Sequence, residues 1–373
     1  MDIRKEAYNK AIKVIELCST PYGFFAAYPG YDMVFARDAI IISLGASLLG
    51  DKFKKTFEAS LITLGKAQSN KGQIPNAVDN FSKRKHHTDY KSIDSTLWYI
   101  IGHYIYKKRY NDNTLFNKEK VKIKKAINWL SYLDIGEDSM IEQLPTTDWQ
   151  DAFPHKYGHT INTQALYYFV LKLSGQNFKA EKLKYYVNKN YENRLWDNKK
   201  GFYLPWRWKN HNKYQEKGEW FDSLGNLLAI VFGLANKHQA EKILSYIKKK
   251  KIEEPYPIKA IFPPIKKGTK EWHDYFLDSD AGKPYHYLNG GIWTFIGGFY
   301  ILALIKLKKL KEAERQFKRL TKANLKKPEF NEWLHGKTGK VGNSSSGSNG
   351  NQGWNAGMYI LAYESLKENK VIL

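Results

Sequence analysis

Apolar residues recur at the three- and four-residue spacing of amphipathic helices through nearly the whole chain. Period-two alternation, the pattern of a half-buried strand, is confined to short pieces around residues 201–208. Gly, Pro and Asn breaks divide the helical pattern into twelve predicted helices, so the predicted fold class is all-α. They span residues 3–18, 36–49, 51–67, 92–108, 118–134, 159–174, 177–193, 220–235, 237–249, 290–306, 308–323 and 353–368.

The predicted helices alternate between two kinds. Those over 36–49, 220–235 and 290–306 are rich in aliphatic residues and Gly, and we expect them to be buried on all sides. Those over 51–67, 237–249 and 308–323 are rich in Lys or Glu and have one apolar face. Six helices of each kind in alternation predict an (α/α)6 barrel, built as a single domain of residues 1–373. The loops that precede the buried helices would meet at one end of the barrel and form a pocket.

These loops are long and carry much of the unusual sequence. They span 68–91, 135–158, 194–219, 250–289 and 324–352, and loops beyond ~12 to 15 residues in a compact domain are usually functional. One stretch, 342–350, is so rich in Ser, Gly and Asn that we predict a flexible flap. The chain also holds 11 Trp and 26 Tyr. Sugar rings present apolar C–H faces edged by hydroxyls, so aromatic platforms flanked by polar side chains favour a saccharide pocket.

Charge and cysteine content exclude several other functions. The formal net charge is +23, but the lysines cluster at 118–125, 248–251 and 306–311, on or at the ends of predicted outer helices. We interpret these clusters as solvated faces and expect no specific nucleic-acid binding. Apolar runs such as 40–44 and 227–234 are far shorter than the ~20 residues of a membrane span. The N-terminus lacks the layout of a secretory signal, so no membrane contact and a cytoplasmic location are expected. Cys18, the single cysteine, excludes an internal disulfide, and we expect no metal and no cofactor.

Isolated carboxylates stand in two of the long loops. Asp148 and Asp151 lie in an aromatic and polar segment just before an apolar helix, and Glu332 lies before the last predicted helix. Hydrolysis of a glycosidic bond needs an acid for the leaving oxygen and a second carboxylate that takes a proton from water. From these residues alone, either Asp148 or Asp151 could be the acid. Carboxyl groups ~6.5 to 9.5 Å apart would fit inversion, and ~5 to 5.5 Å would fit retention.

Seven motifs follow one another in a fixed order between residues 36 and 354. They are Ala36-Arg37-Asp38; Ile93-Asp94-Ser95-Thr96-Leu97-Trp98; Asp151 with Tyr157-Gly158-His159 and Gln164-Ala165-Leu166; Phe221-Asp222-Ser223-Leu224-Gly225-Asn226; Tyr285-His286 with Asn289-Gly290-Gly291-Ile292-Trp293; Glu332-Trp333-Leu334-His335-Gly336-Lys337-Thr338-Gly339; and Gln352-Gly353-Trp354. Together they resemble the neutral or alkaline invertases of plants and bacteria. They are also similar to the amylo-1,6-glucosidase domain of glycogen debranching enzymes; both groups are inverting (α/α)6 glycosidases.

The resemblance implies an inverting glycoside hydrolase in which Asp151 is the general acid and Glu332 the general base. It favours a sucrose-like substrate, as in a beta-fructofuranosidase, with an amylo-α-1,6-glucosidase as the alternative. The residues expected to bind the substrate are Arg37, Asp38, Asp94, Asp148, Trp149, His159, Gln164, His286, Asn289, Trp293, Trp333, Gln352 and Trp354.

The chain departs from both families at two places. Asn162 stands where they tend to carry a Glu, and Tyr287-Leu288 intervene between His286 and Asn289. These departures leave the substrate open between the two families. Two other classes of function also stay open. A carbohydrate-binding protein without catalysis would bind sugar equally well without the two carboxylates. A basic nucleic-acid binder would keep its affinity at high salt, which a merely positive surface does not.

Overall fold

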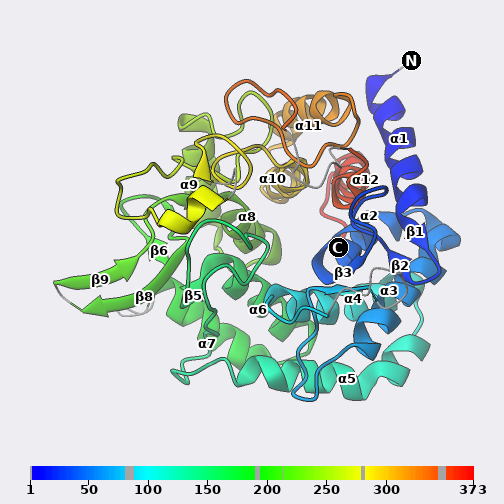
Figure 1. Cartoon of the computed structure of the whole chain (residues 1–373), viewed down its shortest axis with the longest axis horizontal. Coiled ribbons are helices and arrows are strands. Elements are labelled where there is room, and N and C mark those ends of the chain that lie inside the picture. The colour runs from blue at the N-terminus through cyan, green and yellow to red at the C-terminus, as the bar shows by residue number, and fades with distance from the viewer. Residues whose placement is uncertain (1, 80–87, 190–193, 212, 279–281, 343–349) are drawn as a thin grey trace. The chain divides into compact units, whose positions relative to one another are not determined.

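The helices follow the buried and amphipathic patterns of the sequence. The computed structural model describes residues 2–79, 88–189, 194–211, 213–278, 282–342 and 350–373 (Figure 1). Twelve α-helices lie within these ranges: α1 (Ile3–Cys18), α2 (Ala36–Ala46), α3 (Lys54–Lys66), α4 (Asp94–Tyr110), α5 (Thr114–Ser131), α6 (Ile161–Leu173), α7 (Asn177–Asn188), α8 (Ser223–Phe232), α9 (Lys237–Lys249), α10 (Thr294–Lys306), α11 (Leu310–Asn324) and α12 (Gly353–Lys367). The predicted all-α class is confirmed.

Every second helix is buried nearly all round. All residues of α2 and α8 are buried, and α4, α6, α10 and α12 are buried over most of their length. The helices between them bury one face: in α9 the buried residues Gln239, Ala240, Ile243, Leu244 and Ile247 recur every three or four positions. The predicted alternation of two helix kinds is therefore present.

Local capping fixes several of these helices. Asp222 caps α8 by accepting a hydrogen bond from the backbone N–H of Gly225, and Gly233, whose φ of 89° favours glycine, follows the last residue of α8 as its C-cap. Asn236 and Gln239 form a capping box at the start of α9.

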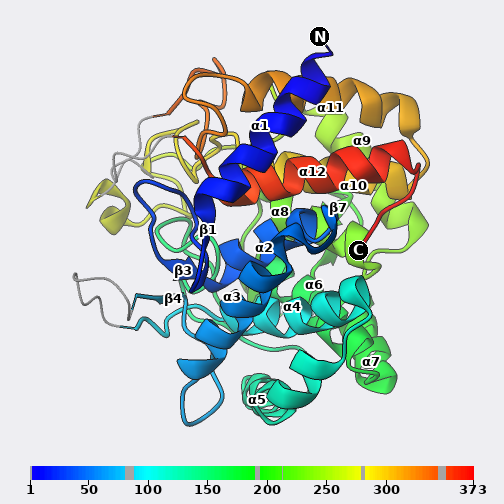
Figure 2. The same cartoon turned by 90° about the vertical axis from the view of Figure 1, so that its right-hand side faces the viewer.

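Residue contacts divide the chain into two compact units. The first comprises residues 1–130, 310–332 and 341–373, and the second comprises 131–309 and 333–340. In the first unit, α12 packs against α1, α2 and α11, and α2 also packs against α4 (Figure 2). The contact of α2 with α12 is very close, because a Cβ added at Gly45 would lie 1.9 Å from the carbonyl oxygen of Gly357.

In the second unit, α8 packs against both α6 and α10, and α7 packs against α6. A three-stranded antiparallel sheet joins β5 (His159–Thr160), β8 (Trp206–His211) and β9 (Tyr214–Lys217). Strands β8 and β9 extend together as a hairpin (Figure 1). The register of the sheet pairs His159 with Arg207, so the residues before α6 lie beside this hairpin.

The other strands in the described ranges are two residues long and form four small antiparallel pairs. These are β1 (Ser19–Thr20) with β2 (Gly23–Phe24), β3 (Val34–Phe35) with β4 (Ala77–Val78), β6 (Trp196–Asp197) with β7 (Phe202–Tyr203), and β10 (Phe221–Asp222) with β11 (Ile261–Phe262). Strands β5 and β10 explain why α6 and α8 begin later than predicted: the residues just before each helix pair with another strand.

The end of the helix predicted over 177–193, most of the flap predicted over 342–350 and parts of four of the predicted long loops lie outside the described residues. Within the described ranges, no helix combines the length and apolar character needed to cross a membrane.

Candidate functional site

Asp151 lies on an exposed part of the loop that precedes β5 and α6. Its neighbours in this loop are deeply buried, since Asp148, Gln150 and Lys156 have no exposed surface. The loop therefore presents Asp151 outward from a fixed base. This placement is compatible with a carboxyl group that meets a ligand from solvent.

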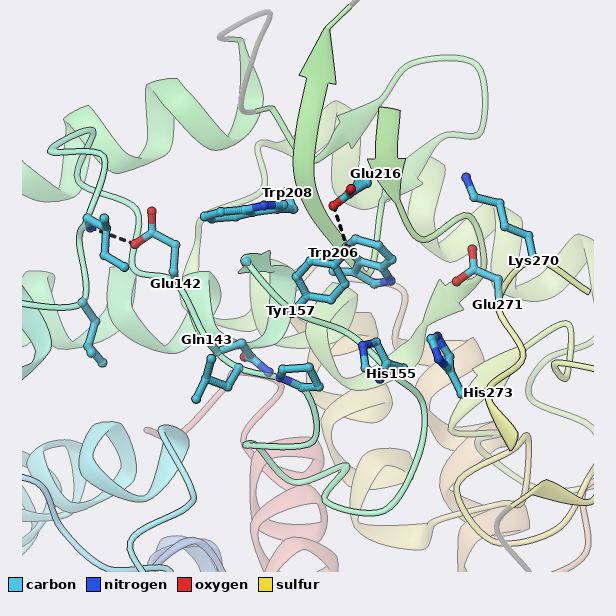
Figure 3. A pocket seen from close by; sticks show the side chains of 15 residues that line it. Glu142, Gln143, His155, Tyr157, Trp206, Trp208, Glu216, Lys270, Glu271 and His273 are labelled. Carbon is cyan, nitrogen blue, oxygen red and sulfur yellow. Dashed lines mark hydrogen bonds between the residues drawn. The ribbon is translucent and has the colours of Figure 1, made fainter. Parts of the chain in front are cut away.

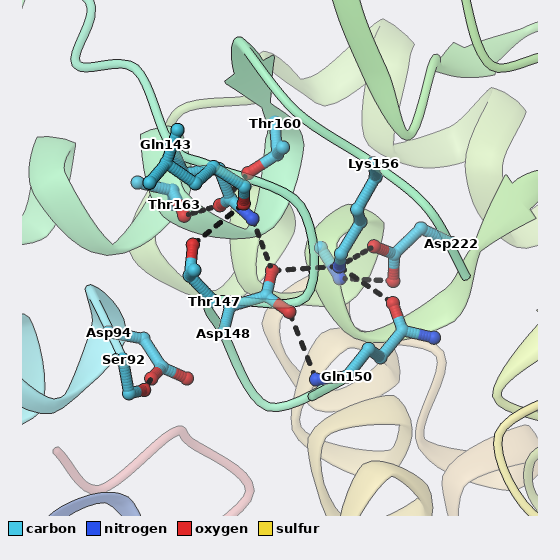
Figure 4. A network of polar contacts seen from close by, with 12 residues as sticks. Ser92, Asp94, Gln143, Thr147, Asp148, Gln150, Lys156, Thr160, Thr163 and Asp222 are labelled. Carbon is cyan, nitrogen blue, oxygen red and sulfur yellow. Dashed lines mark hydrogen bonds and ion pairs between the residues drawn. The ribbon is translucent and has the colours of Figure 1, made fainter. Parts of the chain in front are cut away.

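The base of the loop is held by a buried lysine. Lys156 Nζ lies 2.8 Å from Asp148 Oδ2 and 3.5 Å from Asp222 Oδ2, and it donates to Gln150 Oε1 at 2.7 Å (Figure 4). Burial alone would lower the pKa of Lys156, but the two carboxylates outweigh it and the pKa is raised. Burial raises the pKa of Asp222, against the opposing effect of Lys156. The ion pair gives Asp148 a structural function, and the sugar contact expected of Asp148 stays a prediction.

Gln143 anchors the same loop from its other end. Its Oε1 accepts hydrogen bonds from Thr160 at 2.6 Å and from Thr163 at 2.5 Å, and its Nε2 donates to Asp148 at 3.4 Å (Figure 4). Both ends of the Asp151 loop are thus tied to the start of α6.

Glu332 belongs to the first unit, whereas Asp151 belongs to the second. The side chain of Glu332 is buried, and its Oε1 accepts a hydrogen bond from the Tyr31 hydroxyl at 3.1 Å. A backbone bond from Gln352 N to Phe330 O at 3.0 Å links the segment before Glu332 to the start of α12. The carboxylate of Glu332 is therefore oriented by Tyr31, and the segment before it is joined to the start of the inner helix α12.

The structure brings together Arg37, Asp38 and Asp94, also in the first unit. Arg37 Nη1 donates to both carboxylate oxygens of Asp94, at 3.1 and 3.0 Å, and Ser92 donates to Asp94 at 2.5 Å. Asp38 lies 4.0 Å from Arg37 Nε. This buried cluster joins the first turn of α2 to the first turn of α4. It therefore has a structural function.

Three further residues that were expected to bind the substrate form hydrogen bonds with other parts of the protein. His159 Nε2 lies 3.2 Å from Glu142 Oε1, while the Gln164 amide makes two bonds to the Ile141 backbone, at 3.3 and 2.7 Å. The Asn289 amide exchanges bonds with Ile265, at 2.8 and 2.9 Å, and donates to Gly282 O at 2.9 Å. These bonds shape the loops that carry the site.

The predicted tryptophans of the second unit form two contacts. Trp149 meets Trp293 edge to face with ring centres 5.6 Å apart, and Trp293 Nε1 donates to Tyr287 O at 3.0 Å. Trp333 lies beside His286 at 5.6 Å. Trp354 and Gln352 start α12 in the first unit. The structure thus pairs Trp149 with Trp293 and His286 with Trp333.

Several buried polar atoms have no hydrogen-bond partner within the described part of the chain. They are Trp149 Nε1, Trp333 Nε1, Gln352 Nε2 and both amide atoms of Asn162. Native proteins rarely leave such atoms unsatisfied, so each is a candidate for contact with a ligand or ordered water. Asn162 is the residue that replaces the Glu of the resembling families.

A pocket of about 620 Å³ opens in the second unit (Figure 3). Its walls combine aromatic rings, carboxylates and aliphatic side chains; they include Leu133, Ile135, Glu142, Gln143, Leu144, His155, Tyr157, Trp206, Trp208, Glu216, Lys270, Glu271 and His273. Of these, none was among the residues predicted to bind substrate. The signal available in the sequence was the aromatic spacing of Trp206 and Trp208 in a loop rich in Trp and Tyr.

Within the described residues, no three or more His, Cys, Asp or Glu side chains are grouped so that they could hold a metal ion.

Comparison with known proteins gives relatives of one kind. A model of the alkaline and neutral invertase family matches residues 196–369. Alkaline/neutral invertase C, mitochondrial, of Arabidopsis thaliana is 24% identical, covering 92% of this chain and 64% of that protein. Neutral/alkaline invertase 1, mitochondrial, of Oryza sativa subsp. japonica is 25% identical, covering 66% of this chain and 47% of that protein. The chain thus spans less than two thirds of the length of these relatives.

Solved structures agree over almost the whole chain. The GH63 mannosylglycerate hydrolase from Thermus thermophilus, in complex with Tris and D-glycerate, has a TM-score of 0.72 at 12% identity. The alignment covers 95% of this chain and 99% of that one. A glycosidase variant in complex with glucose has a TM-score of 0.66 at 13% identity, covering 98% and 97% of the two chains.

These likenesses define the fold as the (α/α)6 barrel of such glycosidases, which confirms the architecture predicted from the helix alternation. The chain is similar to the alkaline and neutral invertases, the resemblance that its motifs indicate.

Proposed function

We propose that this chain is a glycoside hydrolase of the invertase type, which cleaves the α-glucosidic bond of a sucrose-like substrate with inversion. The observation that carries the proposal is the family match over residues 196–369, a segment that includes Glu332 and Gln352. The order of the seven motifs between residues 36 and 354 supports it further.

In the proposed mechanism, Asp151 gives its proton to the glycosidic oxygen while the bond from that oxygen to the anomeric carbon breaks. Glu332 takes a proton from a water molecule, whose oxygen bonds to the anomeric carbon from the opposite face. The products are a sugar of inverted anomeric configuration and the released alcohol. The bond from Tyr31 supports the role of Glu332, since it holds the carboxylate in one orientation.

The buried polar atoms without protein partners support a sugar ligand. Trp149, Trp333 and Gln352 supply N–H donors, and Asn162 supplies both a donor and an acceptor. Sugar hydroxyls both donate and accept, so they can satisfy atoms of either kind. Of these residues, Asn162 would contribute an uncharged amide where the resembling families contribute a carboxylate.

A glycosyl-glycerate is the second candidate substrate. The likeness to the mannosylglycerate hydrolase, with a TM-score of 0.72 over 95% of this chain, supports this candidate. The test is to incubate the pure protein with sucrose, isomaltose and glucosylglycerate and to identify the sugars released. Release of glucose from sucrose supports the invertase type, and turnover of glucosylglycerate alone supports the second candidate. Hydrolysis of none of the three would refute the proposal.

We also propose a cytoplasmic location. A lone, buried Cys18 is compatible with a reducing compartment, because disulfides are rare there. The plant relatives are named mitochondrial or chloroplastic, so cell fractionation is the appropriate test.

A further inference from the structure

The pocket in the second unit has the volume of a small-molecule site. Its volume of about 620 Å³ lies in the range of small-molecule sites, which run from ~300 to ~1,000 Å³. Residues on both sides of Asp151 in the sequence line the pocket: Glu142 to Pro145 before it, and His155, Tyr157 and Gly158 after it. Asp151 itself does not line the pocket, so the pocket is distinct from the site of the proposed general acid.

Flat rings are prominent among the side chains that line the pocket. Tyr157 stacks on Trp206 with ring centres 4.6 Å apart and planes inclined by 29°, and His155 stacks on His273 at 4.0 Å. In Figure 3 the rings of Tyr157, Trp206 and Trp208 gather at the centre, with Glu142 on one side and Glu271 on the other. The Tyr157 hydroxyl donates to Glu216 at 2.7 Å, which fixes the orientation of its ring. These are preformed platforms for the apolar face of a ligand.

The rim exposes apolar side chains that proteins usually cover. Ile135 and Leu144 are each 73% exposed and Trp208 is 37% exposed, and all three line this one pocket. Such a concentration of exposed apolar groups indicates a contact surface, whereas isolated exposed residues do not.

Carboxylates stand at the edges of the apolar surface. Glu142 accepts from Ile135 N at 2.9 Å and lies 3.2 Å from His159 Nε2, so its orientation is fixed. Burial raises the pKa of Glu271, and the Glu219 backbone, Lys270 and Trp220 oppose this effect. A carboxylate has about four acceptor positions, so these groups can still receive hydroxyl donors.

We propose that this pocket binds a sugar ring of a saccharide, with its C–H face against Trp208 and Tyr157 and its hydroxyls toward Glu142 and Glu271. Apolar platforms edged by acceptors match a ring that is apolar on its face and donates from its rim. The site does not depend on hydrolysis, so it goes beyond the proposed function.

The experiment uses the full chain carrying Asp151→Asn and Glu332→Gln, so that no probe is consumed. Sucrose, maltotriose and methyl α-glucoside are titrated by calorimetry against this protein and against the same protein with Trp208→Leu. Leucine keeps the apolar character but removes the flat ring. We expect it to weaken saccharide binding by about tenfold or to remove one binding event. Trp208→Phe should retain most of the affinity, and Phe178→Leu, at an exposed aromatic outside the pocket, should change nothing.

Unchanged affinity and stoichiometry for all three probes in the Trp208→Leu protein would overturn the proposal. An apolar dye that binds at Trp208 and that none of the probes displaces would also overturn it. Should Trp208→Leu lose its folded circular-dichroism signal, Glu271→Gln tests the same pocket with the same expected direction. Trp208-dependent binding without hydrolysis by the unmodified protein would reject only the proposed function. Hydrolysis with Trp208-independent binding would reject only this pocket.

Discussion

Lys156 Nζ lies 2.8 Å from Asp148 Oδ2, and neither side chain has any exposed surface. Asp222, the N-cap of α8, completes the arrangement at 3.5 Å. A buried charge is tolerated only when it is paired, so the lysine and its two carboxylates depend on one another. The loop that presents Asp151 is consequently tied to the start of an inner helix.

Lys156→Met should destabilise the protein by about 3 to 5 kcal/mol, because it leaves two carboxylates buried without their cation. Urea denaturation measures this change. Lys52→Met is the matched control, since Lys52 pairs with Glu16 at the surface and such pairs contribute about 0 to 1 kcal/mol. Equal effects of the two substitutions would show that the buried ion pair does not hold the loop.

The contact between α2 and α12 requires glycine. Gly45→Ala places a methyl group 1.9 Å from Gly357 O, closer than any real contact, so the two helices must move apart. We expect the free energy of unfolding to fall by about 1 to 3 kcal/mol, measured by thermal or urea denaturation. Gly136→Ala is a suitable control, because its new methyl group would meet no atom closer than 3.8 Å. A Gly45→Ala protein as stable as this control would contradict the packing.

Burial lowers the pKa of His103 from 6.5 to about 3, and Lys122 adds to the effect. Neither ring nitrogen of His103 has a partner among the described residues. Below pH 6.5 the imidazole of His103 therefore binds a proton in the unfolded chain, whereas in the folded protein it stays neutral down to about pH 3. This histidine makes stability fall with decreasing pH across that window, by up to about 1.4 kcal/mol per pH unit.

His103→Leu should make the acid side of the stability curve less steep between pH 6.5 and pH 3, while changing the slope above pH 7 little. Unfolding free energies measured at half-unit intervals of pH would show it. Parallel curves for the two proteins would mean that His103 already binds its proton in the folded state.

The helices could be predicted well from the sequence because the composition of each segment indicates how much of the helix is buried. A run such as Leu227 to Leu234 has no polar face, so it can only be an inner helix. The short strands were missed, since two residues carry no periodicity. The buried ion pair of Lys156 was missed because lysine is almost never fully buried. No residue near Lys156 in the sequence indicates that Asp222 is its partner. The pocket was missed for a similar reason: the pairing of β5 with β8 brings Tyr157 onto Trp206 from a distant part of the sequence, a contact no local pattern encodes.

The central claim, that Asp151 and Glu332 act as acid and base in an inverting hydrolysis, is tested most directly by the anomer first released. Sucrose is added to the protein and proton NMR spectra are recorded before mutarotation equalises the glucose anomers. We predict that β-glucose appears first, and that neither Asp151→Asn nor Glu332→Gln releases measurable glucose. Release of α-glucose first, or full turnover by either folded variant, would contradict the account.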